Sequence, residues 1–429
     1  MRRRHLLIRA RRVAANFVPR AAHQPWHPTS RRDGWLYVWH MVIAQSIRSG
    51  RVAKALSHRL PRRDRASLPP ASPMYLDDLP GAGTGAEHRA LQPARDAAAP
   101  RLREPAASDP YLAKWKVSLR VPDQQLLSLP NGIVYGATGL IGPDAEHLVV
   151  DSLTTWRVPA GLQLDEARRT QSRGIEQLEG TTASLSMFGF ANYAHWMLQG
   201  FGRAVLIHRS VGFQAVDRIL LPDDAPDFVY ETLSTLGVAD DQLYRIPAAA
   251  SPAYRCERLL TTTLLDNDHV GAQWIVEPLR DAFLGNDPSK PDRLLYVTRE
   301  GALIRRVLNE AEVARELQAR GFEVVTMDGR SLSEQAALTA SARCVVGVHG
   351  AALANLVFAR PGTKVLELVP RNTLNAMYCR LATAIDLDYD VLLGAEPAPP
   401  PRFSRFMMDA DMIVNVGELV DRIDRLLAS

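Results

Sequence analysis

The sequence predicts an α/β protein made of two doubly wound parallel sheets in tandem. Its 429 residues exceed the roughly 250 to 300 residues that one hydrophobic core usually supports. Apolar residues make up 46% and charged residues 23% of the chain, which are values typical of folded domains. From Tyr111 onward, short apolar runs alternate with helix-like stretches, and this alternation indicates parallel strands covered by helices on both faces. We therefore expect a cleft between two sheets, with ligands at the carboxyl ends of the strands.

Composition divides the chain into four parts. Residues 1–65 form a basic extension, and residues 66–110, which are rich in Pro, Ala and Gly, are expected to be a flexible linker without a core of its own. The alternating segments of 111–290 and of 291–429 predict an N-terminal and a C-terminal sheet domain. The three cysteines are widely spaced and lack a Cys-x-x-Cys pair, so the sequence indicates neither a disulfide framework nor a structural zinc site and favours a reducing compartment.

Basic charge is concentrated at the N-terminal end. Residues 1–70 hold 16 basic and two acidic residues, a net charge of +14, whereas the rest of the chain has a net charge of −10. A basic segment of this kind suits an anionic surface, either phospholipid or nucleic acid. The apolar run at 34–47 has arginines on both sides and is too short to cross a bilayer. Two interpretations of this run remain open: an interfacial helix on anionic lipid, or a helix that packs on the rest of the protein or on a partner. The sequence predicts no membrane span and no secretory signal.

Apolar periodicity sets the individual elements. In the N-terminal half we expect strands at 147–152, 217–222 and 258–265, and helices at 192–209 and 227–236. In the C-terminal half we expect strands at 293–298, 322–327, 344–348 and 364–369, and helices at 309–320, 333–341, 351–358, 373–385 and 416–427. Asn309 is expected to cap its helix, with Glu312 completing a capping-box-like pair.

The stretch VVGVHGAALANLVF (345–358) combines a buried strand, a histidine, a glycine and a helix start. His349 and Gly350 fall at the carboxyl end of the strand, and the helix is expected to begin at Ala351. Free backbone N–H groups and the helix dipole at such a point form a site for phosphate. Gly350 allows the backbone to approach a ligand closely, and His349 is able to donate a hydrogen bond to a phosphate oxygen. A histidine that only caps the helix is the alternative.

Three segments together resemble the signature of glycosyltransferase family 61. They are FANYAHWMLQGFGRAVLI (190–207), YVTREGALIRRVLNEAEVARELQARGFEVV (296–325) and VVGVHGAALANLVFARPGTKVLELVP (345–370), and they occur in the family's order. The resemblance implies a GT-B architecture, in which two Rossmann-like domains face each other across a cleft. It also implies sugar transfer with inversion at the anomeric carbon and no obligatory metal or other cofactor.

Carried over by position, the resemblance assigns a nucleotide-sugar site to the C-terminal domain. Arginines would contact the diphosphate because planar guanidinium groups match phosphate oxygens, and the His-Gly-Ala turn would surround it. Glu367 would accept hydrogen bonds from the ribose hydroxyls. The residues implied for nucleotide-sugar binding are Arg299, Arg305, Arg306, His349, Gly350, Ala351, Asn355 and Glu367.

In the N-terminal domain, the resemblance places a helix at the acceptor. Asn192 and Trp196 would bind the acceptor, and His195 would take its proton, because a histidine titrates near neutrality. The sequence departs from the family pattern four residues after this histidine, where Gln199 stands in place of an acid. If that acid is the family's base, this chain lacks it, so the assignment of the base stays open.

Other classes of protein are weighed against this interpretation. Asp266-Asn-Asp268 follows an apolar run, as does the Mg²⁺- or Mn²⁺-binding Asp-x-Asp of metal-dependent GT-A transferases. The pattern also occurs at 386–388 and 409–411, so it carries little information. No Gly-x-Gly-x-x-Gly precedes a helix in either half, which argues against an oxidoreductase. A non-catalytic nucleotide- or nucleic-acid-binding protein is a further alternative, although no zinc, RNP or homeodomain-like pattern supports one and we expect no nucleic-acid partner.

The sequence thus predicts a glycosyltransferase that uses a nucleotide-sugar donor and a glycan or lipid-linked acceptor. The resemblance and the basic extension together suggest a role in surface polysaccharide assembly. We expect a cytoplasmic protein with a peripheral contact on anionic lipid at the inner face of the membrane.

Overall fold

A computed structural model describes most of the chain from Ser72 onward, and residues Arg63–Ser429 group into one compact unit. The expected basic extension, the apolar run at 34–47 and the Asp266-Asn-Asp268 motif lie outside the described residues. Among the described helices, none combines the length and apolar character that a bilayer crossing requires. The described residues are 72–74, 85–92, 95–97, 99–100, 102–110, 112, 115, 119–121, 123–149, 152, 160–187, 189–263, 273–285, 291–371, 375–397 and 410–429.

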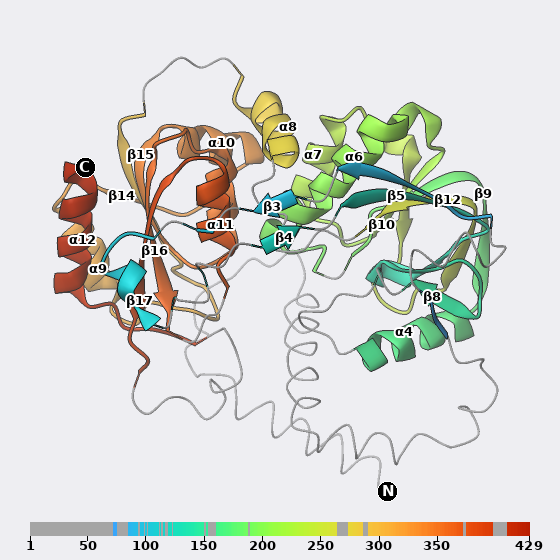
Figure 1. The fold of residues 1–429 in the computed structure, drawn as a ribbon, viewed down its shortest axis with the longest axis horizontal. Coiled ribbons are helices and arrows are strands. Elements are labelled where there is room, and N and C mark those ends of the chain that lie inside the picture. The colour runs from blue at the N-terminus through green and yellow to red at the C-terminus, as the bar shows by residue number, and fades with distance from the viewer. Residues whose placement is uncertain are drawn as a thin grey trace, which may run out of the picture. The chain divides into compact units, whose positions relative to one another are not determined.

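In the described part of the chain, five parallel strands form the C-terminal sheet (Figure 1). Their order across the sheet is β14-β13-β15-β16-β17, and every neighbouring pair is parallel. This is the 2-1-3-4-5 order of doubly wound sheets, so the parallel sheet expected for this half is confirmed. The order reverses between β13 and β15, which is where such sheets bind ligands. The strands are β13 (Arg293–Val297), β14 (Glu323–Val325), β15 (Ala342–Val348), β16 (Lys364–Pro370) and β17 (Asp388–Gly394).

Helices cover both faces of the C-terminal sheet (Figure 1). Tyr296 and its face of the strands share a core with α9 and α12. Leu295 and the opposite face share a core with α10, α11 and the 3₁₀-helix η10. Neighbouring strand residues alternate between the two cores because side chains of a strand point to opposite faces in turn. The bounds are α9 (Glu310–Gln318), α10 (Leu332–Ala340), η10 (Ala351–Phe358), α11 (Met377–Ala384) and α12 (Val416–Ala428).

Two local expectations for this half gain detail from the structure. The helix expected at 351–358 is present and is a 3₁₀-helix. Asn309 stands at the N-cap of α9, but its Oδ1 accepts a hydrogen bond from the Val414 N–H at 3.0 Å and not from the helix. The Asn309 Nδ2 donates to the Val414 carbonyl at 2.9 Å, so this side chain bridges two segments 105 residues apart.

The N-terminal sheet is mixed, so the expectation of an all-parallel sheet is wrong for this half. The described strands β11, β10, β9 and β12 are parallel neighbours, whereas β5 is antiparallel to β12 and β2 is antiparallel to β5. Between β2 and β5 the described residues contain strands and a three-residue 3₁₀-helix, η3 (Ala106–Ser108), but no α-helix, and parallel pairing needs a longer crossover. The bounds are β2 (Glu87–Gln92), β5 (Gln124–Pro130), β9 (Ile175–Ser184), β10 (Arg218–Pro222), β11 (Leu243–Ile246) and β12 (Ala253–Thr262).

Smaller strands, five α-helices and one π-helix are further elements of the described N-terminal half. The expected strand at 147–152 is shorter and pairs with β1 outside the large sheet. The expected helix at 192–209 is one continuous run of α5, the π-helix η7 and α6. The bounds are β1 (Ser72–Met74), β6 (Ile133–Tyr135), β7 (Leu140–Gly142), β8 (His147–Val149), α4 (Ala160–Ser172), α5 (Tyr193–His195), η7 (Trp196–Gly200), α6 (Phe201–Val211), α7 (Asp227–Ser234) and α8 (Gln273–Phe283).

The described part of 66–110 contradicts the expected flexible linker. β2 forms the edge of the N-terminal sheet. Further along, the Arg103 Nε donates to Asp388 Oδ1 at 2.6 Å, which fixes this segment to β17. A strand at a sheet edge is held by its backbone hydrogen bonds and needs few large apolar side chains. For this reason the composition of 66–110, which is rich in Pro, Ala and Gly, gave no sign of strand β2.

Candidate functional site

Arg299 and the His349-Gly350 pair meet at the point where the strand order of the C-terminal sheet reverses. Arg299 follows β13 and His349 follows β15, and these two strands are parallel neighbours. A Cβ atom built on Gly350 would lie 1.5 Å from Nη1 and 2.7 Å from Cζ of Arg299. The Arg299 guanidinium therefore occupies the space that any side chain at 350 would need. The backbone of Gly350 is extended (φ 174°), so the requirement for glycine is steric and not conformational.

His349 is buried and is held by a carboxylate. Its Nδ1 donates to Oε1 of Glu367, and the Tyr389 hydroxyl donates to Oε2 of the same residue. His349 is 3% exposed and Glu367 is 1% exposed. Both oxygens of Glu367 accept from protein groups, so His349 and Tyr389 hold this carboxylate, and its expected contact with ribose hydroxyls stays a prediction. The carboxylate orients the imidazole and leaves Nε2 as the ring atom for a ligand.

Tyr378 on α11 fixes the turn that contains His349 and Gly350. Its hydroxyl donates to the Gly350 carbonyl at 2.6 Å, and its ring lies edge-on to the His349 ring, with centroids 5.3 Å apart. Burial raises the pKa of Tyr378 well above its ordinary value and the charge of Glu367 raises it further, while Arg305 and Arg299 lower it. Both guanidinium groups thus act electrostatically on this turn.

Arg305 adopts a strained backbone conformation near the same turn. Its φ of 56° lies in the left-handed region, which non-glycine residues rarely adopt. Such strain costs on the order of 1–3 kcal/mol and is frequent at binding sites. Together with its electrostatic effect on Tyr378, this conformation supports the expected role of Arg305.

Arg306 and Asn355 have other partners than the expected ones. The Arg306 Nη2 donates to Asp411 Oδ2 at 2.6 Å, and this hydrogen bond raises the pKa of the exposed arginine. Asn355 is 1% exposed, and its Nδ2 donates to Gln335 Oε1 at 2.8 Å. Its Oδ1 accepts from the Tyr193 hydroxyl at 2.6 Å. Both side chains are therefore engaged in contacts within the protein, and their assignment to the nucleotide-sugar site stays a prediction.

η10 is a meeting point for elements of both halves. The Tyr193–Asn355 hydrogen bond joins α5 to η10. Arg280 on α8 donates from Nε to the Val357 carbonyl at 2.6 Å and from Nη2 to the Ala359 carbonyl at 2.5 Å, which satisfies the end of η10. Since half-buried Ala351 begins this helix directly after Gly350, the contacts hold the candidate phosphate turn in place.

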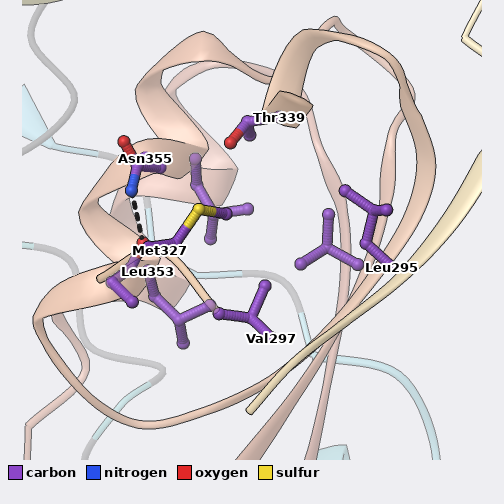
Figure 2. Close-up of a pocket in the computed structure, with 9 residues that line it drawn as sticks. Leu295, Val297, Met327, Thr339, Leu353 and Asn355 are labelled. Atoms are coloured by element: carbon purple, nitrogen blue, oxygen red, sulfur yellow. Dashed lines mark hydrogen bonds between the residues drawn. The ribbon is translucent and has the colours of Figure 1, made fainter. Parts of the chain in front are cut away.

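The hollow beneath η10 is small and largely apolar (Figure 2). Leu295, Val297, Met327 and Leu353 line it, and Asn355 lies at one end, where its Nδ2 bonds the Ala352 carbonyl at 3.0 Å. It therefore lacks the charged groups that a nucleotide diphosphate needs. The candidate site is the turn above it and not this hollow.

Two residues expected at the acceptor have partners within the protein. Asn192 is the N-cap of α5, where its Oδ1 accepts from the Ala194 and His195 N–H groups at 3.0 and 3.3 Å. Trp196 is fully buried, and its Nε1 donates to Thr232 Oγ1 at 2.8 Å. Asn192 thus starts the helix and Trp196 packs in the core, and the acceptor contacts expected of them stay predictions.

His195 is half-buried, and its ring contacts Gln199, which stands where the family pattern has an acid. Its Nδ1 lies 2.9 Å from Oε1 of Gln199, which is 2% exposed. His195 is two residues from Tyr193, which bonds η10. The Tyr193–Asn355 hydrogen bond therefore links the helix that carries His195 to η10, the helix that follows the His349-Gly350 turn. The resemblance leads us to expect such an arrangement, with an acceptor helix beside a donor site.

The N-terminal sheet has its own reversal of strand order, and Arg203 fills it. The order reverses between β9 and β12. Arg203 of α6 is 2% exposed and donates to the Ser184 and Ser186 carbonyls at the end of β9, at 3.2 and 3.1 Å. It also donates to Thr261 Oγ1 of β12 at 2.7 Å. Burial lowers the pKa of Arg203 to about 10. The Arg203 side chain thus occupies the switch point of the N-terminal sheet. The switch point between β13 and β15 of the C-terminal sheet is therefore the candidate position for a ligand.

The rival Asp-x-Asp motifs have structural partners where they are described. Asp388 bonds Arg103, and Asp411 bonds Arg306. Asp266 and Asp268 are outside the described residues, and within those residues no group of three or more His, Cys, Asp or Glu side chains is placed to hold a metal.

Four residues that contact the candidate site or fill the N-terminal switch point were not predicted from the sequence: Tyr378, Tyr389, Arg203 and Glu310. The Glu310 Oε1 accepts from the Tyr296 hydroxyl at 2.9 Å and from the Arg299 N–H at 3.3 Å. The position of Glu310 just after the capping residue of α9 is the one sequence signal that could have suggested it, because acids there often bond a preceding turn.

The fold and this cluster define an α/β protein that presents cationic groups at the switch point of a doubly wound sheet. The sequence model of the family Glycosyltransferase 61 matches residues 193–366 of this chain. The chain is also similar to the β-1,2-xylosyltransferase XAX1 of Oryza sativa subsp. japonica, with 34% identity over 99 residues. That alignment covers 23% of this chain and 17% of the relative.

Proposed function

We propose that this chain is an inverting glycosyltransferase that moves a sugar from a nucleotide-diphosphate sugar to a hydroxyl of a glycan or lipid-linked acceptor. The observation that carries the proposal is the packing of Arg299 on Gly350 at the switch point, beside the buried pair of His349 and Glu367. Guanidinium groups at the carboxyl edge of a parallel sheet suit a diphosphate. The match of residues 193–366 to the family-61 model supports sugar transfer at this site.

In this proposal the two halves work as in a GT-B enzyme. The C-terminal sheet holds the donor, and the N-terminal half supplies His195 to the acceptor. The hydrogen bond from Tyr193 to Asn355 supports this division, because it holds the helix of His195 against the element that follows Gly350. The filled switch point at Arg203 supports it as well, since it leaves the donor site to the other sheet.

The proposed reaction is a single displacement. The acceptor oxygen attacks the anomeric carbon on the face opposite the diphosphate, and a new C–O bond forms. The bond between the anomeric carbon and the diphosphate oxygen breaks, and its electron pair leaves with the nucleoside diphosphate. The acceptor proton passes to Nε2 of His195. Arg299, Arg305 and His349 offset the charge that develops on the leaving group.

The setting of the reaction is proposed from the sequence. The net charge of +14 in residues 1–70 supports peripheral binding to anionic lipid on the cytoplasmic side of a membrane, where surface polysaccharides are assembled from activated sugars. The relative's name makes a nucleotide-activated xylose one donor to test.

Incubation with a panel of nucleotide sugars tests the proposal. We expect slow release of nucleoside diphosphate from one donor by the purified full chain, faster release with a glycan acceptor, and thermal protection by the matching nucleoside diphosphate. An Arg299→Ala variant should lose both responses, whereas Arg371→Ala, a matched arginine that pairs with Asp109, should keep them. Protection by NAD or by DNA without a response to any nucleoside diphosphate would contradict the proposal.

A further inference from the structure

Gln199 holds the ring of His195 from inside the protein. Its Oε1 lies 2.9 Å from His195 Nδ1, at the distance of a good hydrogen bond. Gln199 belongs to the π-helix η7, whose five residues are all buried, so its amide is surrounded by protein and not by water. Short π-helical segments inside longer helices occur frequently at functional sites.

The other side of the His195 ring is also confined. Gly189, with φ 78°, packs against it, and a Cβ at this glycine would lie 3.2 Å from His195 Cδ2. That distance is tighter than nine in ten real Cβ contacts, so a larger residue would press on the ring. The ring is thus fixed by a hydrogen bond at Nδ1 and by the glycine backbone near Cδ2.

The chemistry of the amide selects one form of the histidine. An amide oxygen only accepts hydrogen bonds, so the Nδ1 that faces it carries the hydrogen. In the neutral ring, Nε2 then carries the lone pair. Nε2 is the atom that a base needs, because it accepts a proton while Nδ1–H keeps its hydrogen bond to Gln199.

We propose that Gln199 is a positioning residue that keeps His195 in the Nδ1–H tautomer, with Nε2 ready to take the proton of the acceptor hydroxyl. This inference rests on the proposed function of the chain. During the step, the proton moves from the acceptor oxygen to Nε2, the ring gains one positive charge, and the Nδ1–H bond to Gln199 persists. A neutral hydrogen-bond acceptor thus stands at the position where the family pattern has an acid.

The test combines a spectroscopic measurement with kinetics on the full chain. Two-bond ¹H–¹⁵N correlation of ¹⁵N-histidine-labelled protein reports which ring nitrogen carries the hydrogen, and a His195→Gln variant assigns the signal. We expect the Nδ1–H tautomer in the unaltered chain and in Gln199→Glu, which keeps an acceptor oxygen. In Gln199→Leu, which has a similar size and no acceptor, we expect a mixture of tautomers.

Kinetics should follow the tautomer. We expect kcat to fall on the order of tenfold to a hundredfold in Gln199→Leu, with the KM for the donor unchanged, because general-base catalysis contributes factors of that size or larger. Gln199→Glu should recover most of kcat. The matched control Gln171→Leu removes a glutamine on α4 that bonds the Ala145 carbonyl, and it should leave both the tautomer and kcat unchanged.

Three outcomes would overturn the inference. An Nε2–H tautomer at His195 of the unaltered chain would do so even if every variant failed to fold. The unaltered tautomer in Gln199→Leu would also do so, and so would an unaltered kcat in that variant. Failure of the proposed function is a separate result: the full chain would then release no nucleoside diphosphate from any donor, whatever the His195 tautomer.

Discussion

Replacement of Gly350 by alanine is expected to remove Arg299 from the candidate donor site without unfolding the protein. The new Cβ would lie 1.5 Å from Nη1 of Arg299, so the guanidinium must withdraw by about 2 Å to reach van der Waals contact. The atom that must move is the far end of a flexible side chain, and the extended backbone at 350 accepts alanine. The clash therefore acts on Arg299 and not on the sheet.

The size of the effect follows from the lost contact. A hydrogen bond to a charged group contributes about 1.5–3 kcal/mol, so the Kd for a nucleoside diphosphate should rise roughly tenfold to 150-fold. The free energy of unfolding should stay level or rise by about 0.4–1 kcal/mol, because alanine restricts the unfolded chain. Calorimetric titration with UDP and GDP measures the first quantity, and urea unfolding measures the second. Gly417→Ala is the matched control, since a Cβ there meets only Asn415 Oδ1 at 3.5 Å.

A double-mutant cycle separates this mechanism from a general disturbance. If Gly350→Ala acts by displacing Arg299, it should weaken binding little further in a chain that already carries Arg299→Ala. Additive losses in the double variant would refute the reasoning, as would normal nucleotide affinity in Gly350→Ala alone.

Three further predictions concern residues outside the turn. Arg306→Ala should lower the free energy of unfolding by no more than about 1 kcal/mol in urea unfolding, because Arg306 is an exposed side chain whose ion pair with Asp411 is screened by water. Its nucleotide affinity should be unchanged, and a large loss of affinity would place Arg306 in the site. Trp196→Phe should cost about 1–3 kcal/mol of stability by leaving Thr232 without its buried donor, with no change in the KM for an acceptor. Burial raises the pKa of Tyr135 to about 12, above the ordinary value of 10, so its neutral form stabilises the fold below pH 10 and that contribution is lost as the pH rises toward 12. Tyr135→Phe should flatten the alkaline fall in unfolding free energy over this interval, and an unchanged slope would contradict the assignment.

The meeting of Arg299 with His349 and Gly350 was predictable because it depends on topology. Residues that follow neighbouring parallel strands reach the same edge of a sheet, and the apolar runs of β13 and β15 identify those strands in the sequence. The partner of Glu367 was not predictable in the same way. The contact between Glu367 and His349 depends on the register of β15 and β16, which pairs Glu367 with Gly347. This register brings the Glu367 carboxylate to the same face of the sheet as His349.

The different environments of neighbouring side chains of the same type were also not predictable from the sequence. Arg305 and Arg306 look equivalent in the sequence, yet Arg305 adopts a left-handed backbone conformation, whereas Arg306 forms a hydrogen bond to Asp411. β2 was not predictable either, because a strand held by backbone hydrogen bonds at a sheet edge leaves little trace in its composition.

The burial of Arg203 has a consequence for stoichiometry. Each of the two large sheets in the described residues reverses its strand order between two parallel neighbours, and a chain with two open switch points of this kind could bind two nucleotides. Arg203 satisfies the ends of β9 and β12 with its own hydrogen bonds, so one of the two positions is closed from within. A calorimetric titration of the chain with its nucleoside diphosphate should accordingly saturate at one equivalent.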